Sequence, residues 1–64
     1  MYNLYLARVR RGLTQQKLAE RAGVSRRTVI YLEQGQHLPT LRVGLRLCNA
    51  LGCSMDEVFS DVLL

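Results

Sequence analysis

The side chains best suited to nucleophilic or metal chemistry in this 64-residue chain are two cysteines and one histidine. Four residues separate Cys48 from Cys53, and His37 lies well upstream of both. This spacing matches none of the cysteine and histidine patterns that bind zinc. A disulfide between the two thiols would close too short a loop to stabilise the chain appreciably. We therefore interpret both cysteines as reduced, small hydrophobic residues and expect no metal site.

The carboxylates make no stronger case for catalysis. Asp56 and Glu57 are adjacent, and their position at a predicted helix start explains them without general acid–base chemistry. No serine–histidine–aspartate or cysteine–histidine set is arranged for nucleophilic catalysis, and no glycine-rich phosphate loop is present. A chain this short also has little room for a deep pocket beside a core. The sequence therefore predicts no enzyme and indicates no cofactor or small-molecule ligand.

Basic side chains are concentrated in one part of the chain. The formal net charge is +4, and seven of the nine basic residues lie between Arg8 and Arg27, whereas three of the five acids lie within 56–61. A basic region in a small domain is typical of proteins that bind polyanions. A solvated surface that only keeps the chain in solution would give the same composition.

Residues that begin and end helices divide the chain into five short predicted helices within one domain, 1–64. The first covers 2–11, the second and third follow the N-cap residues Thr14 and Ser25, the fourth covers 41–51 after Thr40, and the fifth follows Ser54. Ser54 and Glu57 form a capping box. Glycines at 12, 23, 35 and 52 end the first four. No segment alternates with period two, so the predicted fold class is all-α.

Apolar residues at helical spacing predict which faces form the core. They are Leu18, Ala19 and Ala22 in the second helix, Val29 and Leu32 in the third, and a broad face of Leu41, Leu45, Leu47, Cys48 and Leu51 in the fourth. Gly44 weakens the fourth helix but would allow a close contact with another helix.

The most specific pattern lies at about 15–34, where two short predicted helices are joined by a tight turn. Ala19 is small where the third helix crosses over the second, and Gly23 permits a left-handed turn residue. Two helices joined in this way form a helix-turn-helix, whose second helix, here about 26–34, can enter a major groove about 12 Å wide.

At this point the sequence resembles the Cro/phage-repressor helix-turn-helix family, also called the xenobiotic-response-element family. The matching stretches are 13–19, 22–25, 28–29, 32–35, 39–41, 50–52 and 55–59, so the resemblance covers about residues 4–59. It implies a lambda-repressor-like fold and a transcriptional regulator that binds double-stranded DNA. The DNA-binding positions that it implies are Gln15, Gln16, Ser25, Arg26, Arg27, Thr28, Tyr31 and Gln34. It also implies a structural ion pair between Arg8 and Glu33, which would otherwise be two solvated side chains.

The residues themselves agree with a DNA-facing third helix. With Val29 and Leu32 buried, Arg26 and Arg27 lie on other faces at the start of this helix, where cations are disfavoured unless an anion is present. Arginine can bind guanine O6 and N7 in a bidentate manner. Tyr31 could contact a thymine methyl group or a phosphate, and the hydroxyl and free N–H groups at the helix start suit a phosphate.

Several features leave alternatives open. Ile30 could contact DNA, a partner or the first helix, and His37 could bind a phosphate or be a plain loop residue. The apolar end of the segment 60–64, together with Ile30 and Leu38, also suits a protein-interaction module, such as an antitoxin-like or co-regulator subunit. Non-specific nucleic-acid binding is a third reading.

One domain of this size reads only a few base pairs, so we expect a homodimer on a palindromic operator with half-sites about 34 Å apart. Its interface is expected to use the fourth and fifth helices and the segment 60–64. No apolar run reaches the length of a membrane span, and the first residues lack a signal-peptide pattern, so we expect a cytoplasmic protein.

Overall fold

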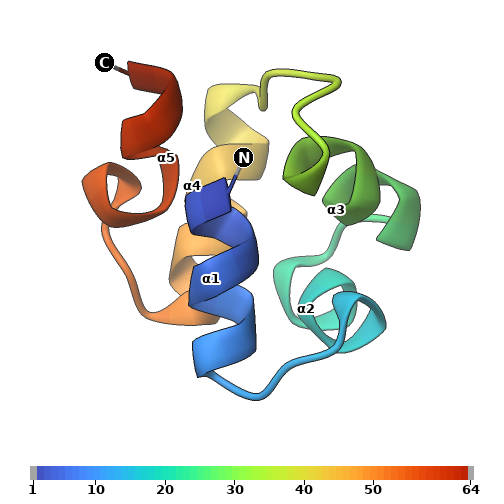
Figure 1. The fold of residues 1–64 in the computed structure, drawn as a ribbon. Helices are drawn as coiled ribbons and strands as arrows, with labels where there is room; N and C mark the ends of the chain where they lie inside the picture. The colour runs from blue at the N-terminus through green and yellow to red at the C-terminus, as the bar shows by residue number, and fades with distance from the viewer. Residues whose placement is uncertain (1, 64) are drawn as a thin grey trace.

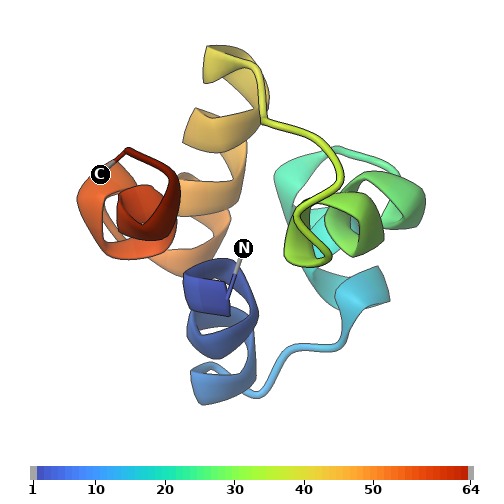
Figure 2. The ribbon, with the colours of Figure 1, turned by 45° about the horizontal axis from the view of Figure 1, so that its top comes forward.

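The computed structural model describes residues 2–63, which form five α-helices and no strand. The helices are α1 (Tyr2–Arg10), α2 (Gln15–Ala22), α3 (Arg26–Glu33), α4 (Leu41–Leu51) and α5 (Met55–Leu63). In Figure 1, α2 and α3 lie on one side of α1 and α5 lies on the other. Figure 2 shows α4 between α5 and the pair α2–α3. The predicted all-α class with five helices is confirmed.

The helices start where the predicted caps place them. The side chains of Thr14, Ser25 and Thr40 accept hydrogen bonds from N–H groups three residues later, at distances of 3.0, 3.1 and 3.2 Å. At α5 the Glu57 N–H donates to Ser54 Oγ at 3.2 Å, and the Ser54 N–H donates to Glu57 Oε1 at 3.3 Å. Both halves of the predicted capping box are therefore formed.

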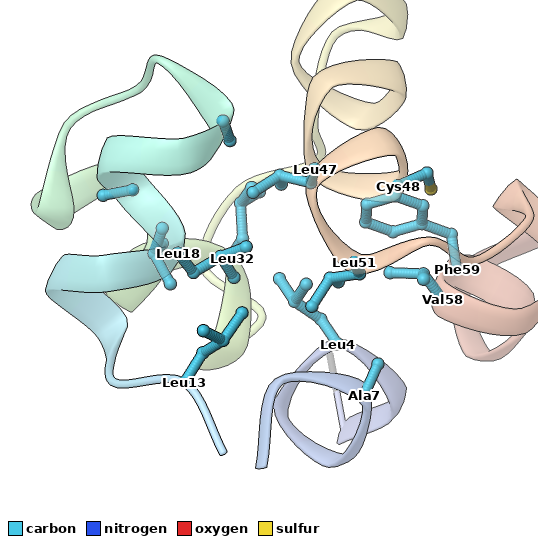
Figure 3. Close-up of a cluster of buried hydrophobic side chains, with 13 residues drawn as sticks. Leu4, Ala7, Leu13, Leu18, Leu32, Leu47, Cys48, Leu51, Val58 and Phe59 are labelled. Carbon is cyan, nitrogen blue, oxygen red and sulfur yellow. The ribbon is translucent and has the colours of Figure 1, made fainter. Parts of the chain in front are cut away.

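One hydrophobic core joins all five helices. Its buried members are Leu4, Ala7, Leu13, Leu18, Ala19, Ala22, Val29, Leu32, Leu47, Cys48, Leu51, Val58 and Phe59. Figure 3 shows Leu4 and Leu51 near the middle of this cluster, with the side chains of α5 on one side and those of the α2–α3 pair on the other. Because members from every helix meet in the same cluster, the core fixes the helix-turn-helix to the rest of the domain.

The predicted apolar face of α4 is wrong at two positions. Leu41 and Leu45 are 70% and 46% exposed, whereas Leu47, Cys48 and Leu51 are buried. The helix packs through the stripe that contains Gly44, and at 100° per residue Leu41 and Leu45 fall beside this stripe rather than on it. The apolar face that the sequence predicts for α4 is therefore wider than the part of α4 that the other helices cover.

Gly44 marks the close approach of α4 and α5. A Cβ atom at this position would lie 3.0 Å from Met55 Cε and 3.5 Å from Phe59 Cε2. The close helix contact predicted at Gly44 is therefore present. Beside it Cys48 is buried, with its Sγ 3.5 Å from Met55 Sδ. Burial, together with the negative charge of Cys53 and Glu57 when ionised, raises the pKa of the Cys48 thiol.

Cys53 is only partly buried, and both cysteines are free thiols. The described residues contain no cluster of cysteine, histidine and acidic side chains able to hold a metal ion. No helix within 2–63 has the length and apolar character needed to cross a membrane.

The last helix, α5, continues to Leu63 with an irregular backbone at Phe59 (φ −117°, ψ 17°). The segment 60–64 is thus helical as far as Leu63, and Leu64 lies outside the described residues. The involvement of this segment in a dimer stays a prediction.

Candidate nucleic-acid interface

The connection between α2 and α3 is a tight turn built on Gly23. Gly23 adopts φ 70°, a left-handed conformation that glycine reaches without a steric penalty. The N–H of the following residue, Val24, bonds to Ala19 O at 3.0 Å, and Ser25 then caps α3. Ala19 is buried beneath the crossing of the two helices. The turn and the small residue together set the angle at which α3 leaves α2.

The C-terminal end of α3 is fastened by Glu33. Arg8 on α1 binds this carboxylate through two atoms, Nε to Oε2 at 2.6 Å and Nη2 to Oε1 at 3.1 Å. Gln15 at the start of α2 donates from Nε2 to Glu33 Oε1, also at 3.1 Å. The Arg8 and Glu33 side chains are only 12% and 7% exposed. One carboxylate therefore joins α1, α2 and α3, and we call this set of three residues the Glu33 cluster.

Arg8 makes further contacts that hold the Glu33 cluster in place. Its Nη1 donates to the Leu13 carbonyl at 2.8 Å, and its Cζ lies 5.4 Å from the centre of the Tyr5 ring. The hydrogen bond to Glu33 raises the pKa of Arg8; burial opposes this effect, and the charges of Glu33 and Tyr5 add to it. The Arg8 guanidinium thus stays charged and binds the Glu33 carboxylate through two hydrogen bonds.

The N-terminal end of α3 is open by comparison. Arg26 and Arg27 are both exposed in the first turn of the helix. Ser25 Oγ accepts the Thr28 N–H and lies 2.8 Å from Thr28 Oγ1, so the two hydroxyls bond to each other at the cap. Positive side chains beside the positive end of a helix are unfavourable alone and become favourable when an anion lies between them.

A wide hollow connects the start of α2 to the start of α3. It is lined by Arg8, Thr14, Gln15, Gln16 and Arg26. Gln16 is exposed there and bonds through Nε2 to Glu20 Oε2 at 3.2 Å, while Gln15 is held by Glu33. Gln15 and Gln16, the two DNA-binding positions implied on α2, therefore lie close to Arg26, one of those implied on α3.

Tyr31 belongs to a second, smaller hollow of about 210 Å³ that also contains Thr28 and the loop after α3. Its ring lies 5.3 Å from the His37 ring, at an angle of 45°. Gln34 is exposed at the opposite end of α3 from Arg26, where it forms the C-cap. The predicted positions thus fall into four places. Gln15, Gln16 and Arg26 line the first hollow, and Thr28 and Tyr31 line the second. Ser25 and Arg27 lie at the start of α3 outside both hollows, and Gln34 lies at its C-cap.

Two contacts of this site join partners that the sequence did not pair, although the resemblance implied that Gln15 supports α3. The hydrogen bond from Gln15 to Glu33 joins residues 18 positions apart, and the Tyr31–His37 ring contact joins α3 to a loop. No local pattern marks either contact. For Glu33 itself, the family resemblance indicated Arg8 as a partner, and a glutamate at a helix C-terminus, where its charge is disfavoured, also favours a cationic partner.

The helix α3 has exposed arginines at its start and is joined to α2 by the tight turn at Gly23. Two helices arranged in this way are typical of a helix-turn-helix DNA-binding domain. The helix-turn-helix family model matches residues 4–58, nearly the whole chain. The protein belongs to this family, in its Cro/C1-type branch.

Curated relatives carry the same description. The chain is 42% identical over 52 residues to YgzD of Bacillus subtilis, an uncharacterized HTH-type transcriptional regulator, covering 81% of this chain and 79% of that one. It is 51% identical over 49 residues to an uncharacterized HTH-type transcriptional regulator of Methanothermobacter thermautotrophicus, covering 75% and 71%. A third relative with this description, from Archaeoglobus fulgidus, is 33% identical over 52 residues, covering 81% and 74%. The protein is therefore a DNA-binding transcriptional regulator and not an enzyme.

Proposed function

We propose that the protein regulates transcription by reading a specific sequence in double-stranded DNA, with α3 in the major groove. The observation that carries this proposal is the exposure of Arg26 and Arg27 at the open end of a helix whose other end is fixed by the Glu33 cluster. Arginine is the side chain best suited to bind guanine, and a fixed helix gives its arginines a defined position relative to the bases.

The remaining implied positions divide between base reading and backbone contact. Gln16 and Ser25 lie near the starts of α2 and α3, where side chains and N–H groups suit phosphate oxygens. The Gln15 amide already donates to Glu33, so its second N–H and its oxygen remain for a phosphate or a neighbouring side chain. Thr28 and Tyr31 follow Arg27 along α3 and would contact the next bases, with Gln34 at the edge of the groove.

The proposal includes a homodimer on a palindromic operator. One recognition helix of eight residues contacts only a few base pairs, which is too few to select a site in a genome. Two copies related by a two-fold axis would place two recognition helices about 34 Å apart on one face of the duplex. Bound to one operator, the complex should contain two chains.

A protein-interaction module is the second candidate function, and the exposed leucines on α4 are the observation that favours it. The dependence of binding affinity on salt concentration distinguishes DNA binding from a protein-interaction function. DNA binding through several phosphate contacts weakens steeply as salt is raised, by about a thousandfold or more between 50 and 200 mM for six contacts, whereas an apolar protein interface does not.

The test is therefore the affinity for short duplexes at several salt concentrations, measured by fluorescence anisotropy with a large excess of unlabelled competitor DNA. The proposal expects steep salt dependence and one duplex sequence that survives competition. Equal displacement by every competitor would reduce the function to non-specific binding, and no binding at low salt would favour the protein-interaction module.

A further inference from the structure

The two cysteines lie at either end of the turn that closes α4, a feature that DNA binding does not use. Gly52 adopts φ 67° there, and its N–H donates to Asn49 O at 3.3 Å. The N–H of Cys53 donates to Cys48 O at 3.0 Å. These two hydrogen bonds form a Schellman motif, in which the side chains of the first and last residues commonly contact each other. The turn therefore brings two thiols together.

We propose that Cys48 and Cys53 form a peroxide-sensitive dithiol, which a hydroperoxide converts into a disulfide across the C-terminal end of α4. This modification site is separate from DNA reading and does not depend on it. The disulfide matters here for the contacts that it changes, and not for any stability gained by closing a loop. Three observations carry the proposal: the separation of the two residues, their different exposure, and their present contacts.

The backbone hydrogen bond limits the distance between the two cysteines. With Cys53 N 3.0 Å from Cys48 O, standard bond lengths keep the two Cα atoms within about 7 Å of each other. Cysteines with Cα atoms further apart than about 7 Å cannot be bridged without backbone movement, so this pair lies within the limit. Burial raises the pKa of the Cys48 thiol, and charge on Cys53 adds to this effect, as expected for neighbouring groups.

The two thiols differ in their access to solvent. Cys53 is only partly buried and lines a small hollow of about 70 Å³ beside α1, together with Ala7 and Glu57. Since about 10–15 Å³ of such space holds a water molecule, a small peroxide fits there. Cys48 is buried in the core beside Phe59 (Figure 3). Cys53 is therefore the thiol that a peroxide meets first, and Cys48 is the one that resolves the product.

The reaction balances in two steps. The Cys53 sulfur attacks one oxygen of the hydroperoxide and the O–O bond breaks, which gives a sulfenic acid and an alcohol, or water if the oxidant is hydrogen peroxide. The Cys48 sulfur then attacks the sulfenic sulfur, the S–O bond breaks, and water leaves with the Cys48 proton. The two sulfurs lose two electrons in total, which the peroxide O–O bond accepts. A thiol reductant restores both thiols.

The new bond would change the packing where α4 meets α5. Cys48 Sγ now lies 3.5 Å from Met55 Sδ, and Cys53 Sγ lies 3.7 Å from Leu51 O. A disulfide holds its sulfurs about 2.05 Å apart, so at least one of them must turn from its present contact. Met55 also lies against Gly44, where a Cβ would be 3.0 Å from Met55 Cε. Oxidation is therefore expected to alter the surroundings of Met55.

The test is treatment of the folded, reduced chain with hydrogen peroxide, followed by iodoacetamide and mass spectrometry of the intact protein. The wild type should become two hydrogen atoms lighter, remain a single chain and lose both alkylatable thiols, and dithiothreitol should restore them. Before oxidation, Cys53 should react with iodoacetamide at least about tenfold faster than Cys48. A wild type that keeps both thiols, forms only disulfide-linked pairs of chains, or only gains oxygen would overturn the proposal.

Two variants test the order of attack. In Cys48→Ala, oxidation of Cys53 should stop at the sulfenic acid, which dimedone traps. In Cys53→Ser, the buried Cys48 should stay reduced at the peroxide dose that oxidises the wild type. Urea unfolding curves establish that each variant is folded, and the wild-type masses decide the question if one is not. Loss of the Cys48 thiol in Cys53→Ser at the wild-type rate would contradict the proposed pairing.

The effect on the α4–α5 packing has its own readout. In protein labelled with ¹³C in its methionine methyl groups, the NMR signal of Met55 should shift on oxidation and return on reduction. The same peroxide dose should leave this signal unchanged in Cys53→Ser, which controls for oxidation of the methionine itself. A Met55 signal that stays in place in wild type shown by mass to carry the disulfide would refute the predicted change in packing.

Discussion

At its C-terminal end α3 is joined to α1 and α2 through Glu33, whose carboxylate accepts hydrogen bonds from Arg8 and Gln15 and is almost fully buried. At its N-terminal end the same helix is capped by Ser25, and Arg26 and Arg27 are exposed. One helix of eight residues thus has a fixed end and an open end.

The difference separates two tasks that DNA recognition requires. A base is read only if the side chain that reads it starts from a defined position, so the backbone of α3 must be held. The reading side chains must also keep their donors available, so they cannot be used to hold the helix. The fixed end holds the backbone of α3, and the open end leaves the reading side chains available. Mutations at the fixed end should therefore lower stability, whereas mutations at the open end should weaken DNA binding.

The largest effect is expected at the fixed end. Glu33→Ala leaves the guanidinium of Arg8 largely buried without its partner, and should lower the free energy of unfolding by about 3–5 kcal/mol. The matched control is Glu20→Ala, since Glu20 forms an exposed ion pair with Lys17 at 3.7 Å and should cost at most about 1 kcal/mol. Urea unfolding followed by circular dichroism gives both values. Equal losses would show that the Glu33 cluster does not hold α3.

At the open end the expected loss is in DNA affinity. Arg26→Ala and Arg27→Ala should each weaken binding to the preferred duplex by about 1–3 kcal/mol if the side chain reads a guanine. Unfolding should change by less than about 0.5 kcal/mol, since neither side chain is buried. Arg21→Ala removes the same charge from the last turn of α2 and serves as the control. If Arg21→Ala weakens binding equally, the arginines act through net charge alone.

The cap of α3 allows stability and binding to be separated at one residue. Ser25→Ala removes the acceptor of the Thr28 N–H and should cost about 1 kcal/mol of stability. Ser25→Asp restores an N-cap acceptor and should recover that stability, but its negative charge faces the proposed phosphates and should weaken DNA binding. Chemical denaturation and anisotropy on the same two variants measure both outcomes. Stronger DNA binding by the aspartate variant would place the phosphates elsewhere.

The smallest expected effect lies at the α4–α5 junction, away from both ends of α3. Burial raises the pKa of the Cys48 thiol above its ordinary value in the folded protein, so the folded state retains a proton that the unfolded state loses. Stability should therefore fall as the pH rises above about 9, by less than about 1 kcal/mol per pH unit, and this contribution should disappear in Cys48→Ala. Urea midpoints at several pH values provide the comparison. An identical pH dependence in the variant would contradict the assigned cause.

Much of this arrangement was predictable because it depends on local residues. Thr14, Ser25 and Thr40 begin helices through contacts three residues away, and Gly23 makes a turn through its own backbone. The spacing of Val29 and Leu32 likewise identified the buried face of α3. Such signals lie within one helical turn, where a single sequence is most informative.

The exceptions depend on contacts between distant segments. Leu41 and Leu45 have the composition of core residues, but α5 approaches α4 along the stripe of Gly44 and leaves them outside. The bond between Gln15 and Glu33 requires that two helix ends meet in space. Helix periodicity gives the possible buried faces, whereas the neighbours that cover each face are set by the packing of the whole chain.

The central claim is that the open end of α3 reads DNA sequence, and selection from a random duplex pool tests it most directly. Wild type, Arg26→Ala, Arg27→Ala and Arg21→Ala would be carried through the same rounds at low and at physiological salt. The account predicts a palindromic motif for the wild type and for Arg21→Ala, with selectivity lost at defined guanines in the two α3 variants. A wild-type pool without any motif at either salt concentration, or an unchanged motif in both α3 variants, would contradict it.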